Sequence, residues 1–379
     1  MRMFTHLHVH TQYSVLDGAS AISDLFATAK ADNQKALAIT DHGNMYGVKE
    51  FLKEAKKAEI KPIVGCEVYV ARNSRFDKNG KEDQGGRHLI LLAKNKTGYQ
   101  NLMKLVSLGF IEGFYMRPRI DKEILFRYKE GLIVSSACIG GEIPKLIRSD
   151  DMEGAERVAL EFKEQFGDDF YLEVQRHPNN DPYTMRVYQE QTVANKGIIE
   201  LSKKLGIKII ATNDVHFVHK EDADMHDRLI CINTGAKLAD TDRMRYTKQE
   251  WLKTQTEMQE LFADIPEAIA NTDEIVDKVE EYSISSKAIM PLFPIPKEYA
   301  NDDDYLRHLT YEGAKKRYAE ISPELTERID FELNTIKKMG FPGYFLIVQD
   351  FISEARKMGV TVGPGRGSAA GSAVAYCLG

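Results

Sequence analysis

Nine side chains of the kinds that bind metal ions lie at or near the ends of predicted strands in this sequence. Five are histidines, three are carboxylates and one is a cysteine: His8, His10, Asp17, His42, Glu67, His88, Cys138, Asp214 and His216. Borderline metal ions such as zinc, manganese and iron accept nitrogen, oxygen and sulfur ligands together. Because these ligand types recur at the ends of separate strands, the sequence predicts a centre with several metal ions.

Three histidines alternate with apolar residues in the first predicted strand. In THLHVHT, His6, His8 and His10 share one face, because side chains of an extended chain alternate with a period of two. Leu7 and Val9 face the surrounding helices. We interpret His8 and His10 as ligands. His6 lies one step deeper. It binds a metal, orients a ligand, or belongs to a hydrogen-bonded polar network.

Two further predicted ligands belong to the next two strands. His42 follows the apolar run 35–40, at the C-terminal end of a strand, where the active sites of barrels lie. Its neighbour Asp41 is either a helix cap or an acid that orients a ligand. Glu67 lies in an otherwise apolar strand, where an unpaired carboxylate is costly, so we expect it to bridge two metals. Cys66 points the opposite way and is assigned to the core.

The later strands supply the remaining candidates. Cys138 ends the run 131–137 and is interpreted as a ligand, although a buried free cysteine can also be a small apolar residue. Asp214 and His216 repeat the spacing of the first histidine pair and share one face. His177, at another strand end, is a weaker candidate for the pocket. Three other histidines are assigned to the surface or to helices: His219, His226 and His308.

This set of ligands predicts metal-assisted hydrolysis of phosphate esters. Bound metals lower the pKa of water to about 7 and stabilise both oxygens of an in-line displacement at phosphorus. A site rich in imidazole and poor in carboxylate keeps positive charge, which favours an anionic substrate.

A second candidate site is the glycine-rich stretch GPGRGSAAGS, residues 363–372. It contains neither the GK[ST] of a Walker A motif nor the spacing of a dinucleotide fingerprint. Ser368 can cap a following helix, and a helix N-terminus beside Arg366 can bind a phosphate. A purely structural turn is the alternative interpretation, although the arginine inside the turn favours an anion.

Seven apolar runs form the predicted sheet that positions the first site. They are residues 4–10, 35–40, 60–70, 88–94, 131–137, 169–175 and 208–215. Amphipathic stretches such as 46–59 lie between most of them, and this alternation favours a mostly parallel α/β barrel. The polar segment 71–87 has no helical period, so we expect a hairpin or long loop. If the strand at His88 then runs antiparallel, His88 lies at the same barrel end as Glu67.

The remaining chain predicts closing helices and a second unit. Residues 221–234, 247–263 and 266–281 are predicted helices, and the proline-containing stretch after them reads as an extended linker. Helices are expected near 303–319 and 323–339. The expected domains are therefore 1–285, a linker at 286–302, and 303–379.

Composition limits the classes of partner. The 379 residues suffice for about two domains. The formal net charge of −6 excludes a polybasic nucleic-acid binder, so any contact with DNA needs a local patch. The four cysteines form no CxxC pair, which fits a reducing compartment. The first residues resemble no signal peptide, and no apolar run is long enough for a membrane span. We expect a cytoplasmic protein without a membrane partner.

The nine ligands in this order resemble the polymerase-and-histidinol-phosphatase (PHP) family. HLHVHTQYSVLDG, ALAITDHGNMYG, IKPIVGCEVYV, GFPGYFLIVQDFI and GPGRGSAAGS further resemble the family of bacterial DNA polymerase III alpha subunits, of the shorter DnaE type. The resemblance implies a distorted (βα)7 barrel, followed by the first part of a smaller α+β palm. It also implies three metal positions: His8, His10, Glu67 and Asp214; then Glu67, His88 and Cys138; then Asp17, His42 and His216.

The resemblance also implies activities and partners. We expect two or three divalent metals (zinc, manganese or iron) and 3′–5′ exonuclease activity, with His10, Glu67 and Asp214 as catalytic residues. In the palm, Arg366, Gly367 and Ser368 are expected near the triphosphate of a nucleotide. The polymerase aspartates of the family are missing from these 379 residues, so we expect an N-terminal fragment that does not polymerise. For the full-length protein, the implied partners are Mg²⁺, primer-template DNA, deoxynucleotides, a sliding clamp and a proofreading subunit.

Two other functions stay open. A small-molecule phosphatase of the same superfamily would not need the palm-like segment. A scaffold that docks a separate proofreading subunit would not need an intact set of ligands.

Overall fold

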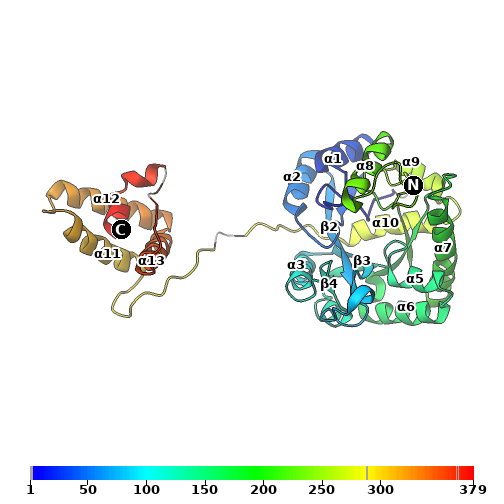
Figure 1. Cartoon of the computed structure of the whole chain (residues 1–379), viewed down its shortest axis with the longest axis horizontal. Coiled ribbons are helices and arrows are strands. Elements are labelled where there is room, and N and C mark those ends of the chain that lie inside the picture. The colour runs from blue at the N-terminus through cyan, green and yellow to red at the C-terminus, as the bar shows by residue number, and fades with distance from the viewer. Residues whose placement is uncertain (1–2, 287–288, 364, 366) are drawn as a thin grey trace. The chain divides into compact units, whose positions relative to one another are not determined.

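The computed structural model divides the chain into two compact units, Met1–Ile284 and Ser285–Gly379 (Figure 1). The structure describes residues 3–286, 289–363, 365 and 367–379. Arg366, one of the predicted phosphate-binding residues, lies outside the described residues. Within the described part, no helix is both long and apolar enough to cross a membrane.

The first unit is built on a seven-stranded mixed sheet. Its path runs β1 (Ala36–Ile39), β2 (Lys61–Val70), β3 (Arg87–Ala93), β5 (Leu132–Ser135), β6 (Phe170–Gln175) and β7 (Ile209–Thr212), and the short β4 (Arg119–Ile120) pairs with β2. Strand β3 is antiparallel to both neighbours, and the other pairs are parallel. The hairpin or long loop expected at 71–87 is confirmed. Because β3 runs antiparallel, the condition under which His88 lies at the same barrel end as Glu67 is met.

The first predicted strand, residues 4–10, is not a regular strand but closes the sheet on itself. On one side the amides of Ala38 and Thr40 donate to the carbonyls of His6 and Val9. On the other side the amide of His10 donates to the carbonyl of Val215, and the amide of Val215 donates to the carbonyl of His8. This segment therefore joins the β1 edge to the chain that follows β7, as a distorted barrel requires.

Helices cover the outside of this sheet (Figure 1). They are α1 (Ile22–Ala31), α2 (Val48–Ala58), α3 (Lys96–Ile111), α4 (Lys122–Arg127), α5 (Glu142–Arg148), α6 (Met152–Phe166), α7 (Met185–Leu205) and α8 (Ala223–Thr234). In α2 the buried residues Val48, Phe51 and Ala55 recur at helical spacing and pack on the sheet. Asn95, Asp121 and Asp151 cap α3, α4 and α6 with their side chains, which explains where these helices begin.

Helix α10 (Pro266–Lys278) covers the barrel end at which the parallel strands begin. Its Ile275 and Val276 pack with the inward-facing Ile63 and Ile210 in one buried cluster. Lys61, at the start of β2, donates to the carbonyl of Val276 at 2.7 Å. Because this end is filled, the opposite end, where the parallel strands finish, is the one left for a site.

The predicted helix 247–263 is shorter than expected. Helix α9 spans only Gln255–Leu261, and Trp251 instead forms a bridge to Phe217 in extended chain. Thr254 and Glu257 form a capping box, each bonding to the other's backbone, and this box sets the start of the helix.

The second unit consists of helices in its described residues. They are α11 (Asp302–Arg317), α12 (Pro323–Met339), α13 (Pro342–Lys357), α14 (Ala373–Leu378) and a 3₁₀ turn at Ser368–Gly371. We expected an α+β unit, but residues 289–363, 365 and 367–379 contain no strand. The backbone hydrogen bonds of these helices form within each helix. Their apolar faces bury Leu306, Ile329, Leu346 and Val374 against one another. The glycine-rich stretch has few side chains to bury and no strand to pair with.

Candidate metal centre

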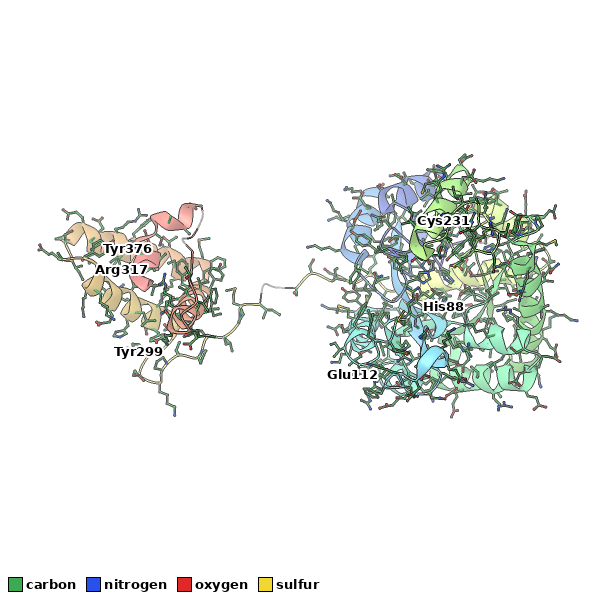
Figure 2. The ribbon with its side chains drawn as sticks, viewed as in Figure 1. His88, Glu112, Cys231, Tyr299, Arg317 and Tyr376 are labelled. Atoms are coloured by element: carbon green, nitrogen blue, oxygen red, sulfur yellow. The ribbon has the colours of Figure 1, made fainter. Side chains whose placement is uncertain are left out.

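The predicted ligands converge at the end of the barrel opposite α10. Three groups of side chains bring their ligand atoms within 4.8 Å of one another: His8, His10 and Glu67; Glu67, His88 and Cys138; and His10, His42 and His216. Figure 2 labels His88, which comes from the start of β3. Because β3 runs antiparallel to β2, the start of β3 lies beside the end of β2. His88 therefore pairs with Tyr69, two residues after Glu67.

The first group is completed by Asp214. Its Oδ1 lies 3.1 Å from Nε2 of His8 and 3.3 Å from Nε2 of His10. The Nε2 atom of His8 is also 3.4 Å from Oε1 of Glu67. Asp214 has a positive φ of 48°, a backbone conformation that suits a residue ending a strand at a functional site. These four side chains match the first implied metal position.

The second and third groups contact different oxygens of Glu67. Its Oε1 is 2.8 Å from Nδ1 of His88, and the sulfur of Cys138 is 3.6 Å from the same nitrogen. Its Oε2 contacts Nδ1 of His42. Nε2 of His42 in turn lies 3.3 Å from Oδ2 of Asp17. Glu67 therefore contacts members of all three groups, the arrangement expected of a bridging carboxylate.

Several buried acceptor atoms in this cluster lack a hydrogen-bond partner among the described residues. They are Asp17 Oδ1, His42 Nδ1, Glu67 Oε2 and Asp214 Oδ1. The second and third of these touch each other without hydrogen-bond geometry. Leaving buried polar atoms unsatisfied is costly, and a bound ion is one of the explanations for such atoms in a native structure. Divalent cations would satisfy all four atoms, so the residues present fit a metal centre.

A carboxylate that the sequence analysis missed supports the first group. Glu173 is buried in β6, and its Oε1 lies 2.7 Å from Nδ1 of His8. Ser135 donates to its Oε2 at 2.6 Å, and Thr212 donates to its Oε1 at 2.5 Å. The signal was available, because Glu173 interrupts an apolar strand just as Glu67 does.

A second carboxylate holds His10. The Asp41 carboxylate accepts hydrogen bonds from the amide of Thr11 at 2.6 Å and from the hydroxyl of Ser14 at 2.8 Å. The Ser14 oxygen lies 3.1 Å from Nδ1 of His10. Of the two roles left open for Asp41, the structure favours the acid that orients a ligand. Cys66 is fully buried, as expected of a core residue.

The other histidines fall into different places. Nε2 of His6 lies 2.7 Å from the carbonyl of Lys253, away from the three groups, and burial lowers the pKa of His6 to about 4. His177 lines the cavity in front of the site and contacts the carbonyl of Asn213. His226 belongs to α8 but is buried rather than on the surface. Its Nε2 lies 2.7 Å from the carbonyl of Asp17.

Strong electrostatic coupling follows from this packing. Burial raises the pKa of Glu67, but the charges of His88 and His42 outweigh it and hold that pKa well below its ordinary value. Burial lowers the pKa of His8, but Asp214 and Glu173 outweigh it and raise that pKa well above its ordinary value. Burial likewise lowers the pKa of His42, but Asp17 and Glu67 outweigh it and raise that pKa, so protons on His8 and His42 neutralise the buried carboxylates in this arrangement. Metal ions would replace those protons, so binding is expected to release them.

The cluster opens to a cavity of about 260 Å³. Its lining includes His88, Cys138, Asp214 and His216, together with Tyr246 from the chain after α8. The Tyr246 hydroxyl lies 3.3 Å from both Oδ2 of Asp17 and Nε2 of His216. The candidate centre is thus accessible to a ligand from one side, and Tyr246 lies at its rim.

The second candidate site differs from the expectation. Ser372, not Ser368, caps the helix that follows the glycine-rich stretch, and Ser368 begins the 3₁₀ turn. The N–H groups at the start of α14 are already bonded: Ala373 and Val374 donate to the carboxylate of Glu332 at 3.2 and 3.0 Å. Gly367 has a φ of 82°, which favours glycine.

Two different domain families match the two compact units of the chain. The model of the PHP domain matches residues 6–177, and the model of the bacterial DNA polymerase III alpha NTPase domain matches residues 304–379. The DNA polymerase III alpha subunits of Borreliella burgdorferi and Treponema pallidum are 49% and 44% identical over 99% of this chain. The chain spans 32% of the length of each of these two relatives.

A solved structure is also similar in part. A two-domain protein from Bacteroides vulgatus, described as containing a PHP-like metal-dependent phosphoesterase, is 14% identical with a TM-score of 0.34. The match covers 72% of this chain and 64% of that one. The sequence relatives and the domain models, rather than this structure, carry the family assignment.

Proposed function

The chain belongs to the family of bacterial DNA polymerase III alpha subunits, and from that premise we propose that its first unit is a metal-dependent phosphodiesterase. The proposed substrate is DNA, shortened from its 3′ end. The observation that carries the proposal is the position of Glu67, which contacts members of three ligand groups at the open end of a PHP barrel.

The proposed ligands are the nine residues named from the sequence. His8, His10, Glu67 and Asp214 would hold one ion; Glu67, His88 and Cys138 a second; and Asp17, His42 and His216 a third. Bound zinc, manganese or iron would supply a water of lowered pKa and stabilise charge on the phosphoryl oxygens. The donor set of imidazole, carboxylate and thiolate suits these borderline metals.

The chain's own residues position this chemistry. Glu173 and Asp41 fix the ring orientations of His8 and His10, so the Nε2 atoms of both rings face Asp214. Glu67 is fully buried, so its carboxylate is itself shielded from bulk water. We assign the catalytic role to His10, Glu67 and Asp214, because these three lie where the ligand groups meet. Tyr246 at the rim can donate a hydrogen bond to a phosphoryl oxygen.

A nuclease assay tests this proposal. A 5′-labelled single-stranded oligonucleotide incubated with the purified chain and Mn²⁺ or Zn²⁺ should yield a ladder that shortens from the 3′ end. His10→Ala and Asp214→Asn should abolish the ladder, whereas Glu164→Gln, an exposed change on α6, should not. Activity that survives both active-site changes would come from another site. Faster hydrolysis of small phosphomonoesters than of DNA would favour a phosphatase.

A scaffolding role is a second candidate, and one observation favours it. The ligands come from the chain around nearly every strand of the barrel, so metal ions would tie those strands together. A barrel held in this way could support the polymerase and dock a separate proofreading subunit even if it hydrolysed DNA slowly.

For the whole protein we propose the activity of its relatives, DNA-directed DNA synthesis with Mg²⁺. Gly367 and Ser368, with Arg366 between Gly365 and Gly367, would lie near the triphosphate of the incoming nucleotide. The proposed partners are primer-template DNA, deoxynucleotides, a sliding clamp and other replicase subunits. In the full-length protein, Arg366→Ala should raise the KM for nucleotides. An unchanged KM would remove this segment from the nucleotide site.

A further inference from the structure

A second cavity, of about 620 Å³, lies beside the metal centre and is lined by basic side chains. Arg87 comes from the start of β3, Lys145 and Arg148 come from α5, and Arg186 comes from α7. Ser149 and Gln189 add neutral polar groups. None of these residues belongs to the predicted ligand set.

The positive charge in this cavity is only partly balanced. Glu190 contacts both Arg148 and Arg186, at 2.9 Å in the second case. Within the described part of the chain, neither Arg87 nor Lys145 forms an ion pair. Burial and the positive charges of Arg87 and Arg148 lower the pKa of Lys145. Four cations against one carboxylate leave a positive excess in a chain whose net charge is −6.

Residues that line this cavity are neighbours of the predicted metal ligands, either in sequence or through a hydrogen bond. Arg87 immediately precedes His88, and its side chain leaves β3 on the opposite face. Arg148 donates to the carbonyl of Ile139 at 3.2 Å, and Ile139 follows Cys138. Helix α7 borders both cavities, with Arg186 and Glu190 on one and Val187 and Gln191 on the other.

We propose that this basic cavity binds the sugar–phosphate backbone of the DNA strand whose 3′ end occupies the metal centre. The proposal rests on the phosphodiesterase function proposed above and adds the subsite that holds the strand. Guanidinium groups bind phosphates with paired hydrogen bonds, and a desolvated lysine next to them favours a bound anion.

The lining also indicates which part of the strand is bound. The cavity is lined by charged, neutral polar and aliphatic side chains and by no aromatic ring among the described residues. Bases bind single-strand sites by stacking on aromatic rings, whereas backbones bind through cations. The subsite therefore contacts phosphates and tolerates any base sequence, as an enzyme that shortens DNA of any sequence requires.

A binding assay that does not depend on hydrolysis tests this subsite. The probe is a fluorescent oligothymidylate of about ten nucleotides with phosphorothioate linkages at its 3′ end. Arg87→Gln with Lys145→Gln should weaken binding to the full chain about tenfold at low salt and reduce the salt slope by about 1.4. Lys53→Gln with Lys56→Gln removes the same charge from the exposed face of α2 and should change neither quantity.

Two outcomes overturn the proposal: equal binding by the cavity variant and the wild type, or equal losses in both double variants. Metal content and melting temperature of the cavity variant should match the wild type, which separates loss of binding from loss of fold. If that variant does unfold, Arg186→Gln, a change at an exposed side chain, replaces it and should reduce the salt slope by about 0.7. If the wild type had no nuclease activity, the proposed phosphodiesterase function would be wrong. The binding assay would still test the subsite, because it does not depend on hydrolysis.

Discussion

The carboxylate of Glu173 lies 2.7 Å from Nδ1 of His8, on the side of the ring opposite Asp214. A histidine that binds a metal through one nitrogen is commonly held by a carboxylate at the other. Glu173 itself is fixed by Ser135, Thr212 and Gln175, so the orientation of His8 is set by four residues from three strands.

Glu173→Gln should therefore weaken metal binding without removing a ligand. The amide keeps the size of the side chain but loses the charge that favours a basic His8. Outer carboxylates of this kind typically contribute about 10–100-fold to metal affinity. Competition with a calibrated chelator, read by elemental analysis, measures the change. Glu164→Gln serves as control, and equal metal affinity in all three proteins would remove Glu173 from the support of the centre.

Glu67→Ala should remove more than one metal per chain, because this one carboxylate contacts all three ligand groups. A change of His88, which belongs to one group, should remove fewer. Metal stoichiometry after saturation and gel filtration checks the difference. Cys66→Ala, at the neighbouring position on the other face of β2, should keep the wild-type stoichiometry. Loss of a single ion in Glu67→Ala would contradict the bridging role.

Chelation should destabilise the first unit more than the second. Ions held by ligands from many strands add their binding free energy to folding, and removing them lowers the melting temperature. Hydrogen exchange of the metal-free and metal-bound chain separates the units, because it reports residues 3–284 and 302–379 in different peptides. Equal protection in both states, with metal loss verified, would show that the ions do not hold the barrel.

Much of the first unit could be predicted from residue patterns. The segment before β3 has no helical period and predicted a hairpin or long loop, and an antiparallel β3 was recognised as the condition for His88 to lie beside Glu67. The segment 4–10 was harder, because its hydrogen bonds go to two neighbours that are distant in sequence, Thr40 and Val215, and do not repeat as a strand ladder. Glu173 was missed although the argument used for Glu67, a carboxylate inside an apolar strand, applies to it equally.

The second unit shows what local patterns cannot decide. A glycine-rich turn before a helix suggested free N–H groups for an anion. The acid that bonds those groups, Glu332, comes from the middle of α12. In sequence it looks like any surface glutamate of an amphipathic helix, and only the packing of α12 against α14 reveals its partner.

Glu332→Gln should loosen α14. The carboxylate accepts hydrogen bonds from Ser372, Ala373 and Val374, and its loss should cost about 1–3 kcal/mol. Burial raises the pKa of Glu332, but the amide of Val374 and the other donors outweigh it, so that pKa lies below its ordinary value. The stabilisation is then complete above the pKa of the unfolded chain and is lost as pH falls through the folded pKa. Faster exchange of the Ala373 and Val374 amides, absent in the exposed control Glu327→Gln, measures the effect.

Lys253 should make the first unit more stable as pH rises above neutrality. Its ammonium group is buried beside the ring of Trp251 and within 3.2 Å of the Asn213 side chain, and burial lowers its pKa to about 7. In the unfolded chain the same group has its ordinary pKa near 10.4. Between these values the unfolded state binds more protons, so the free energy of unfolding increases with pH. Lys253→Met should flatten this rise and raise the melting temperature most at pH 7 and below, whereas Lys203→Met, an exposed change on α7, should leave the slope intact. Melting curves of the three proteins across this pH window measure how the melting temperature depends on pH. If that dependence were the same in Lys253→Met and wild type, Lys253 would keep its ordinary pKa in the folded protein.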